Sequence, residues 1–140
     1  MAHEARDAYR AMAALDRSIE FDPQLRELVK IRASQINGCA YCIDMHTHEA
    51  RRAGESDRRM HAVAAWRESP LFSARERAAL ALTDAITRIS ERGVPDEVYE
   101  AAADQFTQPE LAELVMAIVA INAWNRIAVT TGITYDPPHD

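Results

Sequence analysis

The chain has 140 residues, of which 48% are hydrophobic and 27% charged. This composition fits one folded domain and excludes disorder along the whole chain. The chain has 16 Lys and Arg and 22 Asp and Glu, which gives a net charge of −6. It lacks the basic stripe that nucleic-acid binding requires. We therefore expect a single domain over residues 1–140 that binds no nucleic acid.

The first twelve residues lack the apolar segment of a signal peptide. No stretch approaches the roughly 18 apolar residues of a membrane-spanning helix, because Asn122 and Asn125 soon follow the most apolar run, 114–120. We expect a cytoplasmic protein that does not interact with membranes. In a reducing compartment, the C-x-x-C pair Cys39 and Cys42 is more often redox-active or metal-binding than a structural disulfide.

Hydrophobic spacing and helix-terminating residues predict an all-α single domain of about seven helices. In chain order, the expected helices cover residues 4–19, 23–36, 39–53, 56–66, 73–92, 95–106 and 107–131. Ser73 with Glu76, and Thr107 with Glu110, form the S/T-x-x-E pattern of a capping box. Residues 29–34 alternate apolar and polar, as a half-buried strand would, but no other segment offers a partner strand, so we predict a helix there too.

A helix that begins near Cys39 places two cysteines and a histidine together. At about 100° per residue, Cys39, Cys42 and His46 fall within about 60° of one another. Tyr41 and His48 are expected to project to the other side. The first turn of a helix stabilises a thiolate, and a histidine four residues on can accept the thiol proton. A second cysteine can trap an oxidised first one as a disulfide, so this set suits reversible peroxide or disulfide chemistry.

Other interpretations of the same residues remain open. Both cysteines could be small buried side chains. Zinc could take two thiolates and His46, but a structural site usually needs four ligands and there is no second cysteine pair. Covalent haem attachment is excluded, because Ile43 follows Cys42 where a histidine is required.

The segment 27–46 resembles the alkylhydroperoxidase D-like branch of the carboxymuconolactone decarboxylase family. That pattern has a Glu twelve residues before the C-x-x-C pair and a His four residues after it, as Glu27, Cys39, Cys42 and His46 do here. In helix order the resemblance extends over about residues 20–130. It implies an all-α fold that assembles as trimers or hexamers, and the decarboxylase branch lacks the C-x-x-C pair.

The resemblance also implies roles for the matched residues. Cys42 would be the thiol that His46 and Glu27 activate through a proton relay, and Cys39 would be its disulfide partner. Tyr41 stands where one branch of the family has a histidine, which removes one possible relay member. Glu49, one helical turn beyond His46, is a local rival for the role of Glu27.

The function implied is an oxidoreductase that reduces an organic hydroperoxide through a cysteine sulfenic acid and an intramolecular disulfide. No bound cofactor is needed, and an external dithiol of the lipoyl type, another thiol or an electron-donor protein would restore the cysteines. The residues leave open which cysteine meets the peroxide. The alternatives are a disulfide reductase, redox carrier or sensor without peroxidase activity, and a non-redox enzyme resembling the decarboxylases.

Several other residues are expected to be structural. Trp66 and Trp124 are predicted to pack, and Asn122, Asn125 and Arg126 to cap or cross-link helices or to lie at a subunit interface. The acidic residues of the first helix are predicted to form a solvated face. The last helix carries apolar residues on more than one face, which favours oligomerisation: Ile118, Val119, Ile121 and Ile127.

Overall fold

The structure is a computed structural model that describes residues 2–135. Within them the chain forms eight α-helices, one 3₁₀-helix and no strand, which confirms the all-α prediction. The helices are α1 (Arg6–Ser18), α2 (Pro23–Asn37), α3 (Ala40–Arg52), α4 (Asp57–Ala62), the 3₁₀-helix η1 (Val63–Ala65), α5 (Ala74–Thr87), α6 (Ile89–Arg92), α7 (Asp96–Gln105) and α8 (Gln108–Thr131). Both predicted capping boxes form, at the starts of α5 and α8.

The eighth helix arises from a break that the periodicity did not predict. The helix expected to continue to residue 92 ends at Thr87, because the backbone of Arg88 leaves the helical region at φ −102° and ψ 35°. The chain then forms the short α6, in which Ile89 is 57% exposed rather than part of the core face.

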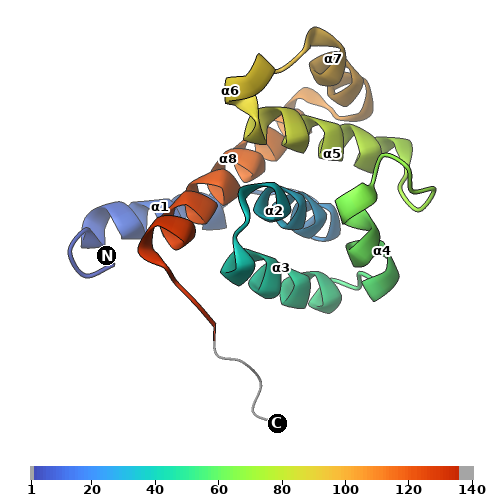
Figure 1. Cartoon of the computed structure of the whole chain (residues 1–140). Coiled ribbons are helices and arrows are strands. Elements are labelled where there is room, and N and C mark those ends of the chain that lie inside the picture. Colours follow the sequence, from blue (N-terminus) through green and yellow to red (C-terminus); the bar gives the residue numbers. More distant parts are fainter. Residues whose placement is uncertain (1, 136–140) are drawn as a thin grey trace.

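Helix α2 lies in the middle of the molecule, with α3 on one side, α5 on the other and α8 crossing beside it (Figure 1). Eight of its side chains are buried, and they are distributed around the helix rather than along one stripe. They are Leu25, Glu27, Leu28, Val29, Lys30, Ile31, Ala33 and Ser34. A helix buried on every side needs no amphipathic period, which explains why residues 29–34 could be mistaken for a strand.

The polar side chains of α2 pair with neighbouring helices. Lys30, only 5% exposed, donates from Nζ to Oδ1 of Asp16 on α1 at 3.0 Å. Arg32 holds Asp84 on α5 through two hydrogen bonds of 2.7 and 3.2 Å. Asp16 is thus an ion-pair partner of a buried lysine, so the prediction of a solvated acidic face on α1 was wrong at this residue.

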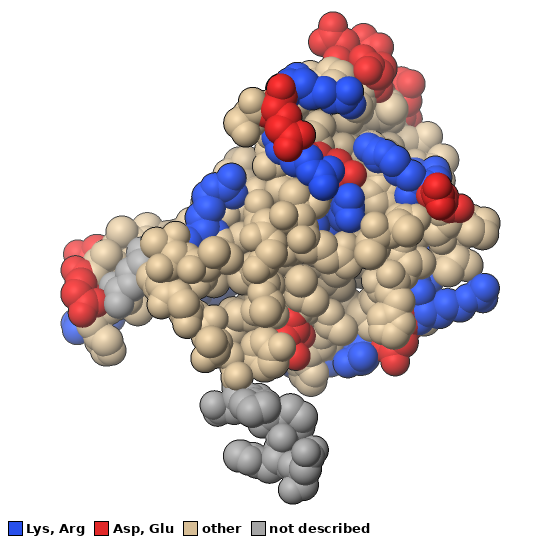
Figure 2. Space-filling model, viewed as in Figure 1, with Lys and Arg blue, Asp and Glu red and all other residues tan. Residues whose placement is uncertain are grey.

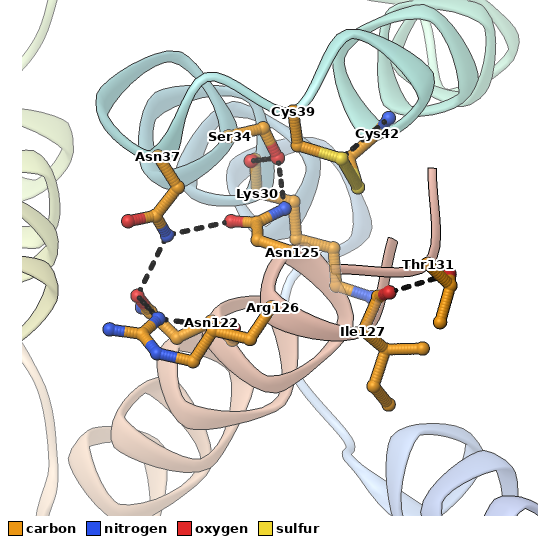
Figure 3. The surroundings of a disulfide bond; sticks show 10 residues. All are labelled: Lys30, Ser34, Asn37, Cys39, Cys42, Asn122, Asn125, Arg126, Ile127 and Thr131. Atoms are coloured by element: carbon orange, nitrogen blue, oxygen red, sulfur yellow. Dashed lines mark hydrogen bonds between the residues drawn. A yellow bond between two sulfur atoms is a disulfide. The ribbon is translucent and has the colours of Figure 1, made fainter. Parts of the chain in front are cut away.

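A chain of amide and hydroxyl groups joins α2 to α8 next to the cysteines (Figure 3). The fully buried Asn125 donates from Nδ2 to Oγ of Ser34 at 3.0 Å and accepts from Nδ2 of Asn37 at 2.9 Å. Asn37 also donates to Asn122 at 3.0 Å, and Arg126 donates to the same Asn122 oxygen. The predicted cross-linking by Asn122 and Asn125 is confirmed.

Helix α8 is long and apolar enough to span a membrane by length and composition, with a mean hydropathy of 1.4 over 18 residues. From the sequence we did not anticipate that this helix passes a test of length and mean hydropathy, but one weakly apolar helix is insufficient evidence for a membrane span. A core helix of a soluble protein meets the same criterion, and 39% of this window is buried in the fold. Here α8 packs against α1, α2, α3, α5 and α7.

Charged side chains are unevenly distributed over the face seen in Figure 2. Lys, Arg, Asp and Glu gather over α5 to α7 and along one edge, whereas the middle, where α8 crosses α2, is mostly uncharged. This face thus offers no extended region of one charge sign to attract a polyanion.

We predict that Asn125→Ala lowers the free energy of unfolding by about 1–3 kcal/mol, because it removes the donor to the buried Ser34 hydroxyl and one of the two acceptors of the Asn37 amide. Urea denaturation followed by circular dichroism measures this change. The control is Arg126→Ala on the exposed side of the same helix, expected to stay within about 0.5 kcal/mol of the wild type. Equal shifts for the two variants would contradict a structural role for the buried amide.

Candidate active site

The turn between α2 and α3 fixes the position of the cysteines. Gly38 ends α2 in the left-handed conformation at φ 68°, which residues with a side chain rarely adopt. The next residue, Cys39, donates its backbone N–H to the carbonyl of Ser34 at 3.0 Å and becomes the N-cap of α3. The C-x-x-C pair therefore begins α3 against the end of the central helix, as the sequence predicted.

Cys39 and Cys42 form a disulfide with their Cα atoms 5.3 Å apart. Sγ of Cys39 also accepts the backbone N–H of Cys42 at 3.3 Å, the bond that an N-cap side chain makes. In the reduced protein, the same N–H groups and the helix dipole would favour a thiolate at this helix start. Both cysteines are 2% exposed and lie in a small buried cluster with Ile121 and Ala128 of α8.

His46 lies one turn beyond Cys42 and is hydrogen-bonded to a carboxylate from α2. Its Nδ1 is 2.7 Å from Oε2 of Glu27, and both residues are 7% exposed. Because a carboxylate only accepts, the shared hydrogen belongs to Nδ1, and Nε2 of the neutral ring is the nitrogen that can take a proton. Arg26 approaches the other Glu27 oxygen at 3.6 Å and balances part of its charge.

Of the two carboxylates that the sequence offered to His46, only Glu27 contacts it. The Glu49 side chain is 44% exposed and pairs with Arg52 at 3.4 Å on the outer surface of α3. The four residues of the sequence motif thus meet, from two helices packed side by side.

A cavity of about 220 Å³ opens beside this group. Cys42 and His46 line it, together with residues of α1, α3, α8 and the segment after α8. The other lining residues are Tyr9, Asp16, Tyr41, Met45, Trp124, Ile127, Ala128 and Ile133. The cavity is therefore mainly aromatic and aliphatic, with the reactive groups in its wall.

Three lining residues differ from what the sequence predicted for them, namely Tyr41, Trp124 and Asp16. Tyr41 was expected to project away from the cysteines, but α1 and α8 close the cavity around the start of α3 and bring Tyr41 into its wall. Trp124, predicted only to pack, contacts the Tyr9 ring edge-on at 5.3 Å and also lines the cavity. The spacing of Ile121, Trp124 and Ala128 on one helical face could have indicated this, whereas no sequence signal marked Asp16.

Trp66 packs in the core as predicted, 5% exposed.

Comparisons with known proteins bear on this arrangement. A sequence model of the carboxymuconolactone decarboxylase family matches residues 4–85, more than half of the chain. The chain belongs to this family. Among its relatives, the uncharacterized protein YdfG of Bacillus subtilis is 47% identical over 107 residues. These residues make up 76% of this chain and 73% of YdfG.

Solved structures share the fold of this family member. A protein of unknown function from Agrobacterium tumefaciens, described as a candidate antioxidant defence protein AhpD, is 39% identical with a TM-score of 0.93, over 98% of this chain and 96% of that one. This likeness confirms the resemblance to the alkylhydroperoxidase D-like branch. The debrominase Bmp8, 21% identical over 96% of this chain and 74% of its own with a TM-score of 0.83, shares the fold alone.

The described residues can be compared with the requirements of the zinc site considered from the sequence. Across positions 2–135, no group of three or more His, Cys, Asp or Glu side chains is arranged to hold a metal ion. His46 instead uses Nδ1 for Glu27, and the two cysteine sulfurs bond to each other. In this geometry the two sulfurs and Nδ1 of His46 are already bonded to protein partners.

We predict that Glu27→Gln slows alkylation of reduced Cys42 by iodoacetamide at neutral pH by about 10²-fold, since a neutral amide no longer stabilises the imidazolium that forms when His46 takes the thiol proton. Mass spectrometry separates labelling at Cys42 from labelling at Cys39. The matched control is Glu49→Gln, which makes the same charge change on the surface of α3 and should leave the rate unchanged. Similar rates for the two variants would argue against the pairing seen between His46 and Glu27.

Proposed function

We propose that this protein is a thiol-dependent hydroperoxide reductase. The observation that carries the proposal is the meeting of Cys42, the His46–Glu27 pair and a mainly apolar cavity at one point. A cavity of about 220 Å³ suits a small organic group, and its aromatic and aliphatic walls suit the R group of R–O–O–H. The candidate antioxidant defence protein with the same fold is consistent with this activity.

Cys42 is the better candidate for the cysteine that meets the peroxide, because it lines the cavity while Cys39 caps the helix behind it. In the reduced protein His46 takes the thiol proton, and Glu27 stabilises the imidazolium. The Cys42 thiolate attacks the terminal peroxide oxygen, the O–O bond breaks, and the products are a sulfenic acid and the alkoxide, which is protonated to the alcohol. The Cys39 thiolate then attacks the sulfenic sulfur, forming the disulfide and releasing water.

Reduction of the disulfide closes the cycle. An external dithiol, of the lipoyl type or carried by an electron-donor protein, exchanges with Cys39–Cys42 and leaves as a disulfide. The protein itself needs no bound cofactor for these steps. A reducing cytoplasm would keep such a donor available, and we propose that compartment as the site of action.

The disulfide also supports a second function, that of a redox carrier or sensor that exchanges disulfides without touching peroxide. The family name leaves a third, non-redox activity resembling decarboxylation. Fold alone does not choose among these, since one fold hosts many chemistries. The three differ in their dependence on peroxide and on Cys42.

We predict that the wild type consumes cumene hydroperoxide with dihydrolipoamide as reductant, and that Cys42→Ser abolishes turnover because the attacking sulfur is gone. The Cys39→Ser control should also fail to turn over, since no disulfide forms, yet should yield one equivalent of sulfenic acid on Cys42, trapped by dimedone and located by mass spectrometry.

Two results would contradict the peroxidase, and a third would exchange the roles of its two cysteines. Disulfide exchange with dihydrolipoamide but no peroxide consumption would leave the carrier or sensor. Activity on a lactone acid that survives Cys42→Ser would support the non-redox enzyme. If sulfenic acid forms on Cys39 in the Cys42→Ser variant but not on Cys42 in the Cys39→Ser variant, Cys39 is the cysteine that attacks the peroxide and Cys42 its disulfide partner.

We further propose that the chain assembles with copies of itself, as a trimer or hexamer. Tyr99 of α7 is 50% exposed and Met116 of α8 37%, and they line a mainly apolar groove of about 600 Å³ between these helices. Val119, one turn on from Met116, is 43% exposed. Apolar surface of this kind is more stable when covered by another chain.

Sedimentation should therefore give a mass three or six times that of the 15.7 kDa chain. Met116→Glu should lower this mass, because it places a charge in the apolar groove. Ile89→Glu introduces the same charge at an exposed apolar residue outside the groove and should not change the mass. A monomeric wild type would contradict the assembly.

A further inference from the structure

Peroxide cleavage at Cys42, on which this inference rests, releases an alkoxide that must be protonated. The O–O bond breaks more readily when a donor contacts the leaving oxygen as charge develops on it. His46 serves first as the acceptor of the Cys42 proton, with its other nitrogen bound to Glu27. With a separate donor in the cavity wall, the removal of the Cys42 proton by His46 and the donation of a proton to the leaving oxygen can both assist cleavage of the O–O bond.

Few groups in the wall can supply that hydrogen bond. Besides Cys42 and His46, the lining side chains with polar groups are Tyr9, Asp16, Tyr41 and Trp124, whose indole N–H is a donor. Asp16 is an acceptor bound to the buried Lys30 at 3.0 Å. The indole of Trp124 can donate a hydrogen bond but does not release its proton near neutral pH, so the two phenols remain as proton donors.

Their places in the fold distinguish the two tyrosines. Tyr9 comes from α1 and packs edge-on against Trp124, with ring centres 5.3 Å apart. Tyr41 directly precedes Cys42 in the first turn of α3, and its partly buried ring packs against the cluster that contains both cysteines. Tyr41 is thus the phenol held next to the reacting sulfur.

The hydroxyl of Tyr41 is not used to hold the fold together. Within residues 2–135, it makes no hydrogen bond to another protein group, although the ring is partly buried. A phenol that lines a mainly apolar cavity without a protein partner can donate to a ligand there.

We propose that Tyr41 donates a hydrogen bond, and then its proton, to the oxygen that leaves the peroxide. The Cys42 thiolate forms the S–O bond while the O–O bond breaks, and the phenolic proton converts R–O⁻ to R–OH. A phenol has a pKa near 10, far below that of an alcohol, so this transfer is downhill. Solvent reprotonates the tyrosinate, and the net change is Cys–SH plus R–O–O–H giving Cys–SOH plus R–O–H.

The test compares peroxides whose leaving groups differ in basicity. Rates of Cys42 oxidation are measured in single-turnover stopped flow with tert-butyl hydroperoxide, which releases a basic alkoxide, and with peracetic acid, which releases the weakly basic acetate. Tyr41→Phe should slow the reaction with tert-butyl hydroperoxide by about 10²-fold and that with peracetic acid less than about threefold, because only the alkoxide needs a proton from an acid. A purely structural role for the hydroxyl would slow both reactions equally.

Tyr99→Phe is the control, since it removes a phenolic hydroxyl from α7, outside the cavity, and should leave both rates within about threefold of the wild type. Tyr9→Phe removes the other phenolic hydroxyl of the cavity, and the proposal predicts no selective loss with tert-butyl hydroperoxide for this variant. Equal losses with both peroxides for Tyr41→Phe, or no loss with either, would overturn the proposal. A selective loss in Tyr9→Phe instead would assign the donor to α1. A wild type whose Cys42 is oxidised by neither peroxide would refute the peroxidase itself, a result distinct from these.

Discussion

The structure depends on a central helix that is buried on every side. A polar side chain on such a helix must be paired, since an unpaired buried polar group costs more than its hydrogen bond returns. On α2 each of these polar side chains pairs with a different neighbouring helix. Lys30 pairs with α1, Arg32 with α5, and Ser34 with α8. Glu27 completes the set by pairing with His46 on α3. The same requirement that holds four helices around α2 therefore also builds the candidate site.

Glu27 shows how structure and chemistry share one interaction. Its hydrogen bond fixes the ring of His46 and leaves the second ring nitrogen able to accept a proton, which in the proposed mechanism comes from Cys42. The buried pair is also part of the packing between α2 and α3, so the orientation of the base is set before any substrate arrives. The left-handed Gly38 contributes equally, because it turns the chain so that both cysteines begin α3 beside the end of α2.

The cavity adds what the motif alone lacks. Cys39, Cys42, His46 and Glu27 explain how a thiol can be activated, but not what reaches it. Residues from α1 and α8 form the walls, and their aromatic and aliphatic character supports an organic peroxide as substrate. The same helices bury the sulfurs, so in the proposed cycle the reducing dithiol would approach Cys42 through the cavity that the peroxide enters.

The sequence by itself determined the local features, because their causes are local. Capping boxes, Gly38 and the periodicity of α8 fixed most helix ends, and the spacing of Glu27, Cys39, Cys42 and His46 identified the motif and the family. Only the tertiary structure decided between Glu27 and Glu49, moved Tyr41 into the cavity wall and gave Asp16 a buried partner. Each of these depends on which helix packs against α2 and α3, and residue spacing within one helix carries no such information.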